Sequence, residues 1–109
     1  MPEPTLVQVF GPGANQDVNT VVRSKTDLAT VGLTAAANNR AEAIFVAELL
    51  LAKQYLNAQN QADNPDIQIV MEDGFPSIVV RNGQRYRQTQ IVVNLQVLEP
   101  DTTIDPDLF

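Results

Sequence analysis

The sequence predicts an α+β fold, in which an antiparallel sheet of about four to five strands packs on one long central helix. Three observations predict this fold. Residues 39–60 form the one segment that is long and periodic enough for a confident helix assignment. Short runs that alternate apolar and polar residues lie on both sides of it. Residues 99–109 are acidic and broken by prolines, so we predict a single domain over 1–98 and an extended C-terminal arm over 99–109.

The predicted helix is apolar around most of its circumference. Asn39 and Glu42 resemble a capping box at its start, and Pro65 ends it. A broad arc should face the sheet, and it contains Ala41, Ile44, Phe45, Leu49, Leu51, Ala52, Tyr55 and Leu56. A second stripe lies on the opposite flank and contains Ala43, Ala47 and Leu50. Helices of this kind are buried on more than one side. Either the chain wraps around the second stripe or a neighbouring subunit covers it, and we favour the neighbour.

Glu48 interrupts the apolar arc of this helix. A buried carboxylate needs a partner or a proton. One interpretation is a general acid or base with a raised pKa. The other is structural: Glu48 pairs with one of the arginines later in the chain, or it lies at a solvated edge of the arc. The sequence places no second catalytic group at a helical spacing from Glu48, which favours the structural interpretation.

Composition excludes several classes of function. The chain contains no His and no Cys, which removes disulfides, the usual zinc sites and nucleophiles that depend on these residues. Its net charge of −6 opposes binding to nucleic acid and to anionic membranes. We therefore expect a non-enzymatic protein with no catalytic residue, cofactor, metal or small-molecule substrate. No secretory leader or membrane span is visible, so we expect a soluble protein made in a cytoplasm.

The first part of the chain is predicted to form strands and turns. Strands are expected over 5–10 and 17–25, the second with a bulge or at a sheet edge. Between them, Gly11-Pro12-Gly13 forces a turn, and nothing around it suggests a phosphate site. Residues 26–37 are small and read as a connection into the helix.

The second part of the chain is predicted to form a hairpin. Strands are expected over 66–72, 77–81 and 84–98, with Asn82-Gly83 as a two-residue turn. In that register Arg81 faces Gln84, Val79 faces Tyr86 and Ile78 faces Arg87. The face of the last strand that should pack on the helix contains Ile91, Val93, Leu95 and Val97. A strand over 84–98 would span about 50 Å, so the tip should project from the body or a bulge should break the strand.

Charge is divided between this hairpin and the C-terminal arm. Arg81, Arg85 and Arg87 surround the turn with Tyr86, and no acidic residue occurs between Gly74 and Leu98. The arm carries the opposite sign and ends in two apolar residues, Leu108 and Phe109. We expect its carboxylates to meet the arginines, either in a neighbouring copy, with Leu108 and Phe109 in an apolar pocket, or in the same chain. A nucleic-acid contact with Tyr86 stacking on a base is a further use of the arginines, which the acidic composition opposes.

The run KTDLATVGLTAAANNRAEAIFVAELLLAK, residues 25–53, with the small size and strand-rich second half, resembles small structural proteins of tailed bacteriophages and prophages. The resemblance implies a virion component of the neck, tail, baseplate or capsid surface, assembled in the host cytoplasm. It would bind itself and other structural proteins. We predict contacts through Ala43, Ala47, Leu50, Arg81, Arg85, Tyr86, Arg87, Leu108 and Phe109. The alternative is a small cytoplasmic adaptor that recognises a partner by strand addition.

Overall fold

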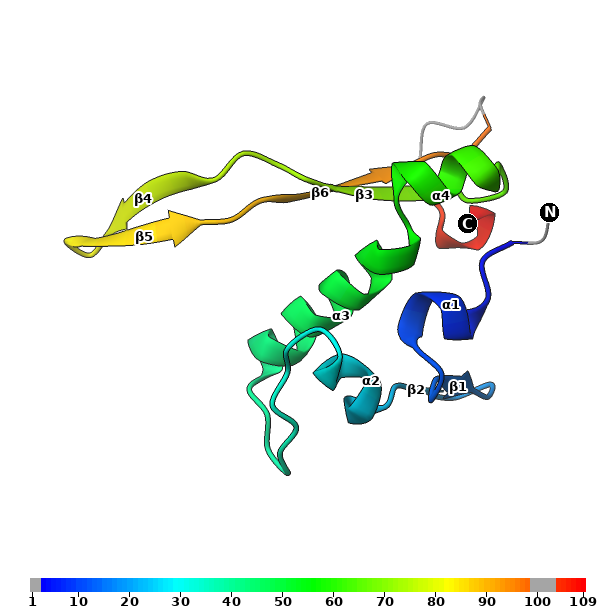
Figure 1. The fold of residues 1–109 in the computed structure, drawn as a ribbon, viewed down its shortest axis with the longest axis horizontal. Helices are drawn as coiled ribbons and strands as arrows, with labels where there is room; N and C mark the ends of the chain where they lie inside the picture. The colour runs from blue at the N-terminus through cyan, green and yellow to red at the C-terminus, as the bar shows by residue number, and fades with distance from the viewer. Residues whose placement is uncertain (1–2, 99–103) are drawn as a thin grey trace.

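An antiparallel ribbon projects from a body built largely of helices (Figure 1). The computed structural model describes residues 3–98 and 104–109. The molecule measures 48 × 34 × 27 Å and has a radius of gyration of 16.2 Å, against about 13 Å for a compact protein of this length. The chain is therefore extended for its size.

The described residues contain four α-helices, one 3₁₀ turn and six strands. The helices are α1 (Leu6–Phe10), α2 (Lys25–Ala29), α3 (Ala41–Tyr55) and α4 (Ala58–Asp63), followed near the C-terminus by η1 (Pro106–Leu108). The strands are β1 (Asn15–Gln16), β2 (Val21–Val22), β3 (Ile69–Asp73), β4 (Ser77–Arg81), β5 (Gln84–Gln88) and β6 (Ile91–Leu95). They pair antiparallel, two by two, as β1–β2, β3–β6 and β4–β5. The α+β class is confirmed, but the predicted sheet of four to five strands is wrong.

Two short helices and one strand, rather than a broad sheet, cover part of the apolar arc of the long helix, and Phe45 of the arc stays exposed. Both α1 and α2 pack against α3, and β3 contacts it at the root of the ribbon. Two of the five predicted strands, over 5–10 and 17–25, do not form as predicted. Residues 6–10 fold as α1, and only Val21 and Val22 of 17–25 lie in a strand, which pairs with β1 rather than with the ribbon.

Local capping explains why residues 5–10 do not form a strand. Thr5 Oγ1 accepts a hydrogen bond from Gln8 N at 3.1 Å, and Gln8 Oε1 accepts one from Thr5 N at 2.9 Å. This reciprocal pair is a capping box, which satisfies two backbone donors of α1 at once. The alternation of apolar residues here was too short to outweigh it.

Capping also divides the strand predicted over 17–25. Asp17 Oδ1 accepts hydrogen bonds from Asn19 N and Thr20 N, both at 2.8 Å, and so forms the turn of the β1–β2 hairpin. The backbone donors of Asn19 and Thr20 lower the pKa of the Asp17 carboxyl. Ser24 Oγ then accepts from Thr26 N and starts α2, which replaces the end of the predicted strand and the first four residues of the predicted connection over 26–37.

The long helix is bent between α3 and α4, where Asn57 caps both halves. Its Oδ1 accepts from Asn60 N at 2.9 Å, and its Nδ2 donates to Gln54 O at 3.1 Å and Lys53 O at 3.3 Å. Asn favours this role because its short side chain competes for backbone groups. The helix ends at Asp63, just before Pro65, as predicted.

Replacing Asn57 tests this double cap. We expect Asn57→Ala to lower the free energy of unfolding by about 1–2 kcal/mol. The backbone N–H of Asn60 in α4 loses its side-chain acceptor, and the carbonyls of Lys53 and Gln54 at the end of α3 lose their side-chain donor. Asn57→Asp is the matched control, since it keeps the acceptor for Asn60 N, and it should lose less. Urea denaturation followed by circular dichroism measures both. Equal losses in the two variants would show that the α4 cap contributes nothing.

The predicted start of the helix is wrong by one residue and in its chemistry. Arg40 occupies the N-cap position and makes no side-chain cap. Asn39 instead closes the preceding loop, where its Oδ1 accepts from Ala36 N at 3.1 Å and its Nδ2 donates to Thr34 O at 2.8 Å. An Asn side chain serves a loop as readily as a helix, so spacing alone did not decide between them.

The ribbon follows the predicted hairpin closely. β4 covers the predicted 77–81, and the register pairs Arg81 with Gln84, Val79 with Tyr86 and Ile78 with Arg87. Asn82 and Gly83 both have positive φ, as a type I′ turn requires. The predicted 84–98 strand is split into β5 and β6, because residues 74–76 lie opposite only residues 89 and 90. One extra residue on one strand is a bulge, so the tip both projects and is preceded by a break.

The core lies where α3 meets the root of the ribbon. Its buried members are Leu56, Ile67 and Met71. Partly buried side chains pack around them, namely Val9, Leu49, Ala52, Tyr55, Ile69 and Ile91. On the predicted helix-facing side of β6, Ile91 reaches this core, whereas Val93 and Leu95 are nearly half exposed. A small core of this kind leaves much apolar surface uncovered.

Candidate interaction surfaces

The β4–β5 hairpin presents two different faces to solvent. Side chains that pair directly across an antiparallel ladder lie on the same face. Ile78 pairs with Arg87 and Val80 pairs with Arg85, so these four residues form one surface, here called the Ile78 face. Ile78 is 54% exposed and Val80 is 68% exposed. Two β-branched side chains thus lie in the open beside two arginines.

The opposite face of the hairpin is internally engaged. Arg81 lies over the ring of Tyr86, with its Cζ 4.5 Å from the ring centroid. The Tyr86 hydroxyl donates to Gln84 Oε1 at 3.2 Å. The structure therefore brings the three predicted arginines onto one hairpin but divides them between its faces. Tyr86 is occupied by Arg81, which is a cation–π contact rather than a stack on a partner.

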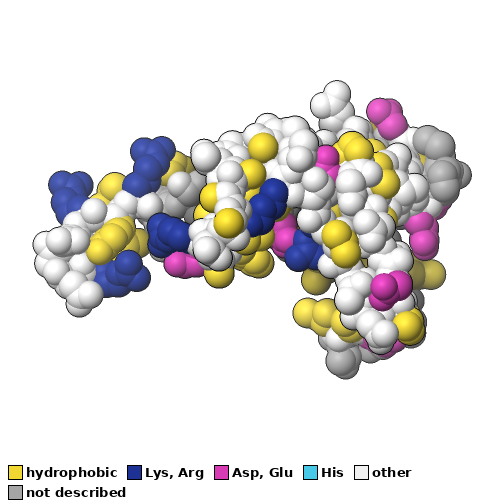
Figure 2. Space-filling model, turned by 90° about the horizontal axis from the view of Figure 1, so that it is seen from below, with side chains coloured by type: hydrophobic (Ala, Val, Ile, Leu, Met, Phe, Trp, Pro, Cys, Tyr) yellow, Lys and Arg dark blue, Asp and Glu magenta, His cyan; other side chains and the backbone are white. Residues whose placement is uncertain are grey.

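Arg85 and Arg87 have no acidic partner within the chain as described. No ion pair joins either guanidinium to a carboxylate of residues 3–98 or 104–109. The whole chain carries −6, and the segment 74–98 carries three arginines and no acidic residue, so the remainder carries −9. Figure 2 shows basic side chains gathered at the projecting end and acidic ones mainly over the body. The molecule is strongly polarised along its length.

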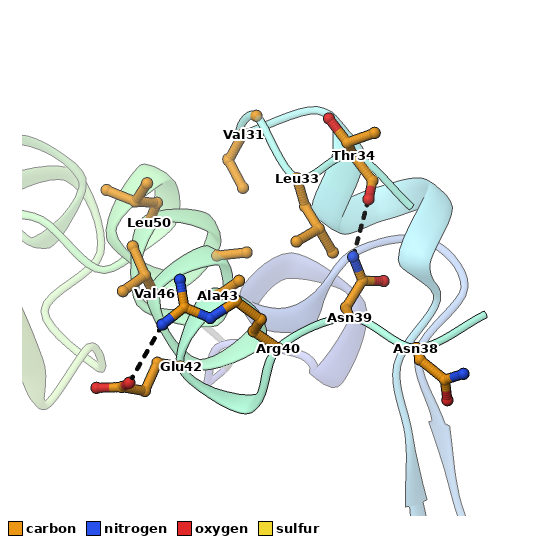
Figure 3. Close-up of a pocket in the computed structure, with 12 residues that line it drawn as sticks. Val31, Leu33, Thr34, Asn38, Asn39, Arg40, Glu42, Ala43, Val46 and Leu50 are labelled. Carbon is orange, nitrogen blue, oxygen red and sulfur yellow. Dashed lines mark hydrogen bonds and ion pairs between the residues drawn. The ribbon is translucent and has the colours of Figure 1, made fainter. Parts of the chain in front are cut away.

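A groove runs along the second apolar stripe of α3 (Figure 3). It has a volume of about 690 Å³, and Ala43, Ala47 and Leu50 lie on its α3 side. Val31 and Leu33 form the other wall, from the loop that Asn39 closes. Ala47 is buried, so the chain itself covers part of the stripe and leaves the rest as an open groove. The chain therefore covers the stripe only in part, and its cover by a neighbouring subunit stays a prediction.

The charged groups at the groove and ribbon root are paired. Arg40 and Glu42 lie at one end of the groove with 3.8 Å between Nη2 and Oε1, and both are largely exposed. Lys53 Nζ contacts Asp73 Oδ1 at 2.5 Å. The groove can therefore accept apolar side chains, and its rim carries no excess of either sign.

Glu48 forms an ion pair with Arg23. Arg23 lies between β2 and α2, so the partner is an arginine, as favoured, but one that precedes the helix rather than follows it. Nearby side chains are apolar and include Val21, Val22 and Ile44. Burial beside these residues explains why the carboxylate requires a cation.

The described part of the C-terminal arm, residues 104–109, lies at the end of the molecule away from the hairpin (Figure 1). Leu108 O accepts a hydrogen bond from Gln68 Nε2 at 2.9 Å. Phe109 lines a pocket of about 310 Å³, here called the terminal pocket, beside Val9, Phe10 and Ile69. The described part of the arm therefore does not meet the hairpin arginines of its own chain. The predicted domain boundary, with Glu99 and Asp101 of the arm, lies outside the described residues.

Several exposed apolar side chains were not singled out from the sequence. Phe75, at the break in the ribbon, is 89% exposed. Phe45 on α3 was predicted to face the sheet, and this is wrong, because its side chain is 62% exposed. Ile78 and Val80 belong to the same class. The Asn82-Gly83 register was sufficient to place Ile78 and Val80 beside the arginines. The exposure of Phe45 required knowing that no sheet covers α3.

The described residues lack two other kinds of site. They contain no group of three or more acidic side chains arranged to hold a metal ion. None of their helices combines the length and apolar character that crossing a bilayer requires. Comparison of the chain with protein families, curated proteins and solved structures finds no match.

Proposed function

We propose that this chain is a non-enzymatic assembly protein that associates with copies of itself and with other structural proteins. The observation that carries the proposal is its surface area. The chain exposes 8213 Å², whereas a compact protein of 11.9 kDa exposes roughly 6,000 Å². The excess is roughly 2,200 Å² on one chain, which is about what one partner contributes to a large obligate interface.

The kind of surface exposed supports the same proposal. Large apolar side chains are exposed on the ribbon, on α3 and in the described part of the arm. Apolar patches of this extent on a small protein mark contacts with other proteins. The predicted contact residues lie on three such regions, which are the α3 groove, the hairpin and the terminal pocket. The setting that we propose is a tailed-phage particle, on the basis of the resemblance of residues 25–53.

Light scattering over a concentration series tests self-association. We expect a mass that is a defined multiple of 11.9 kDa. A mass of one chain at every concentration would contradict the proposal. Mass spectrometry of particles induced from the host strain tests the setting, where the expected result is the presence of the chain in purified particles.

A second candidate function is an adaptor that recognises a partner by strand addition. It is favoured by the free edges of the ribbon, since β4 and β5 pair only with one another. Such an adaptor would be a single chain in solution, so the same mass measurement separates the two functions.

A further inference from the structure

We infer that copies of this chain associate head to tail, with the Ile78 face of one copy docked on the acidic end of the next. The acidic end is defined here as Glu3 and Asp66, which line the terminal pocket, together with the exposed Asp63, Asp105 and Asp107, each of which lies within four residues of a lining residue in the sequence. The inference rests on the proposed self-association and identifies the surfaces that perform it.

Charge is the first argument for this pairing. Arg85 and Arg87 are exposed beside apolar side chains and have no ion pair with the described carboxylates. Their segment carries +3 and the remainder of the chain carries −9. A second copy of the chain therefore supplies the negative charge that Arg85 and Arg87 lack in the described part of their own chain. Every copy carries the same acidic end, so the association can continue from copy to copy. Complementary charge of this kind sets the orientation of association.

Position is the second argument. The hairpin tip and the C-terminal η1 lie at opposite ends of the molecule, whose longest dimension is 48 Å (Figure 1). The two charged surfaces of one copy are thus kept apart by the fold. They can meet only between copies.

Apolar complementarity is the third argument. Ile78 and Val80 form an exposed apolar row about 7 Å long beside the arginines. The terminal pocket offers apolar walls from Val9, Phe10 and Ile69, with acidic residues at its edge. An apolar row flanked by cations therefore matches an apolar pocket flanked by anions. The C-terminal segment keeps its place on its own chain in this arrangement.

The alternative contact between two hairpins is unfavourable. Edge-to-edge or face-to-face pairing of two copies of the hairpin would bring four unpaired guanidinium groups together. A head-to-tail contact avoids this and is heterologous, so it generates a closed ring or an open filament. Both are forms expected of an assembly protein.

Charge reversal on each surface tests the inference by light scattering. Arg85→Glu should lower the association constant about tenfold or more. Val18→Glu is the control, because it adds a negative charge at a 97% exposed position of the β1–β2 turn, outside the three candidate surfaces, and it should change association less than about twofold. Association of the wild type should also weaken as salt rises from about 0.1 M to about 1 M, where the screening length falls from ~10 to ~3 Å.

A mixing experiment separates this contact from every other. Asp107→Arg alone should associate as weakly as Arg85→Glu, and an equimolar mixture of the two variants should associate more strongly than either alone, because the intact hairpin of Asp107→Arg meets the intact acidic end of Arg85→Glu. Both side chains are exposed, so each variant should fold, and circular dichroism checks that it does. Association of Arg85→Glu at wild-type strength would overturn the inference and leave self-association standing. A stronger association would indicate hairpin-to-hairpin pairing instead.

Two further outcomes complete the test. A wild-type chain that stays single at all concentrations would overturn the proposed function together with the inference. Binding of a single-stranded oligonucleotide that Arg85→Glu abolishes, with no change in mass, would assign the Ile78 face to nucleic acid and overturn the inference.

Discussion

Gly11→Ala is expected to lower the free energy of unfolding by about 2–6 kcal/mol. Gly11 has φ 99° and ψ 162°, a backbone conformation that is essentially restricted to glycine. It is also buried against α2, where a Cβ would lie 2.6 Å from Cβ and Cγ of Asp27. Asp27 is itself buried and accepts a hydrogen bond from Gly13 N at 2.7 Å. The side chain that would have to move is therefore held in place.

Gly32→Ala separates the two contributions. Gly32 has φ 110°, but no atom lies within 4 Å of the position that a Cβ would occupy. Its substitution should cost the backbone strain alone, about 1–3 kcal/mol. Urea denaturation at one low protein concentration compares the two variants, because association would add to the apparent stability. Equal losses would show that Asp27 yields easily and that close packing is not what requires glycine at position 11.

This contact also shows what the sequence predicted about the Gly11-Pro12-Gly13 turn and what it did not. The turn followed from residue types. The carboxylate that binds the loop comes from Asp27, which is on a helix that the sequence did not predict. The residues of the turn could be interpreted from the sequence, whereas the side chain that binds the turn depended on the tertiary fold.

The ribbon was the most predictable element because its turn residues fix the register. Asn82 and Gly83 adopt the required positive φ without strain, and every pair along β4 and β5 follows from that turn. The N-terminal strands failed for the converse reason. Thr5, Gln8 and Ser24 offered caps that stabilise helical turns over runs too short for alternation to decide.

The candidate surfaces were predicted as residue types but not as arrangements. The arginines were correctly grouped on the hairpin, yet the stacking of Arg81 on Tyr86 sets it apart from Arg85 and Arg87. The distance between the hairpin and the arm followed only from the fold, since the sequence left both a meeting in one chain and a meeting between copies open. Long-range placement of this kind depends on how α3 and the ribbon join.

Ile67→Ala is expected to lower the free energy of unfolding by about 2–5 kcal/mol. Ile67 is 1% exposed and packs with Leu56 and Met71, so truncation leaves a cavity at the junction of α3 with the ribbon. Folded proteins have free energies of unfolding from about 5 kcal/mol upward, and the small core places this chain at the lower end of that range. A large part of the chain should therefore unfold in the variant at moderate temperature, as circular dichroism during urea or thermal denaturation would record.

Ile78→Ala is the matched control, because it makes the same truncation at an exposed position of the hairpin. It should change the unfolding of the single chain by less than about 0.5 kcal/mol. The same variant should weaken association, since it shortens the apolar row of the Ile78 face. A loss of stability as large as that of Ile67→Ala would mean that the hairpin belongs to the folding core. If Ile78→Ala leaves the free energy of unfolding unchanged and weakens association, the root of the ribbon serves folding and its tip serves assembly.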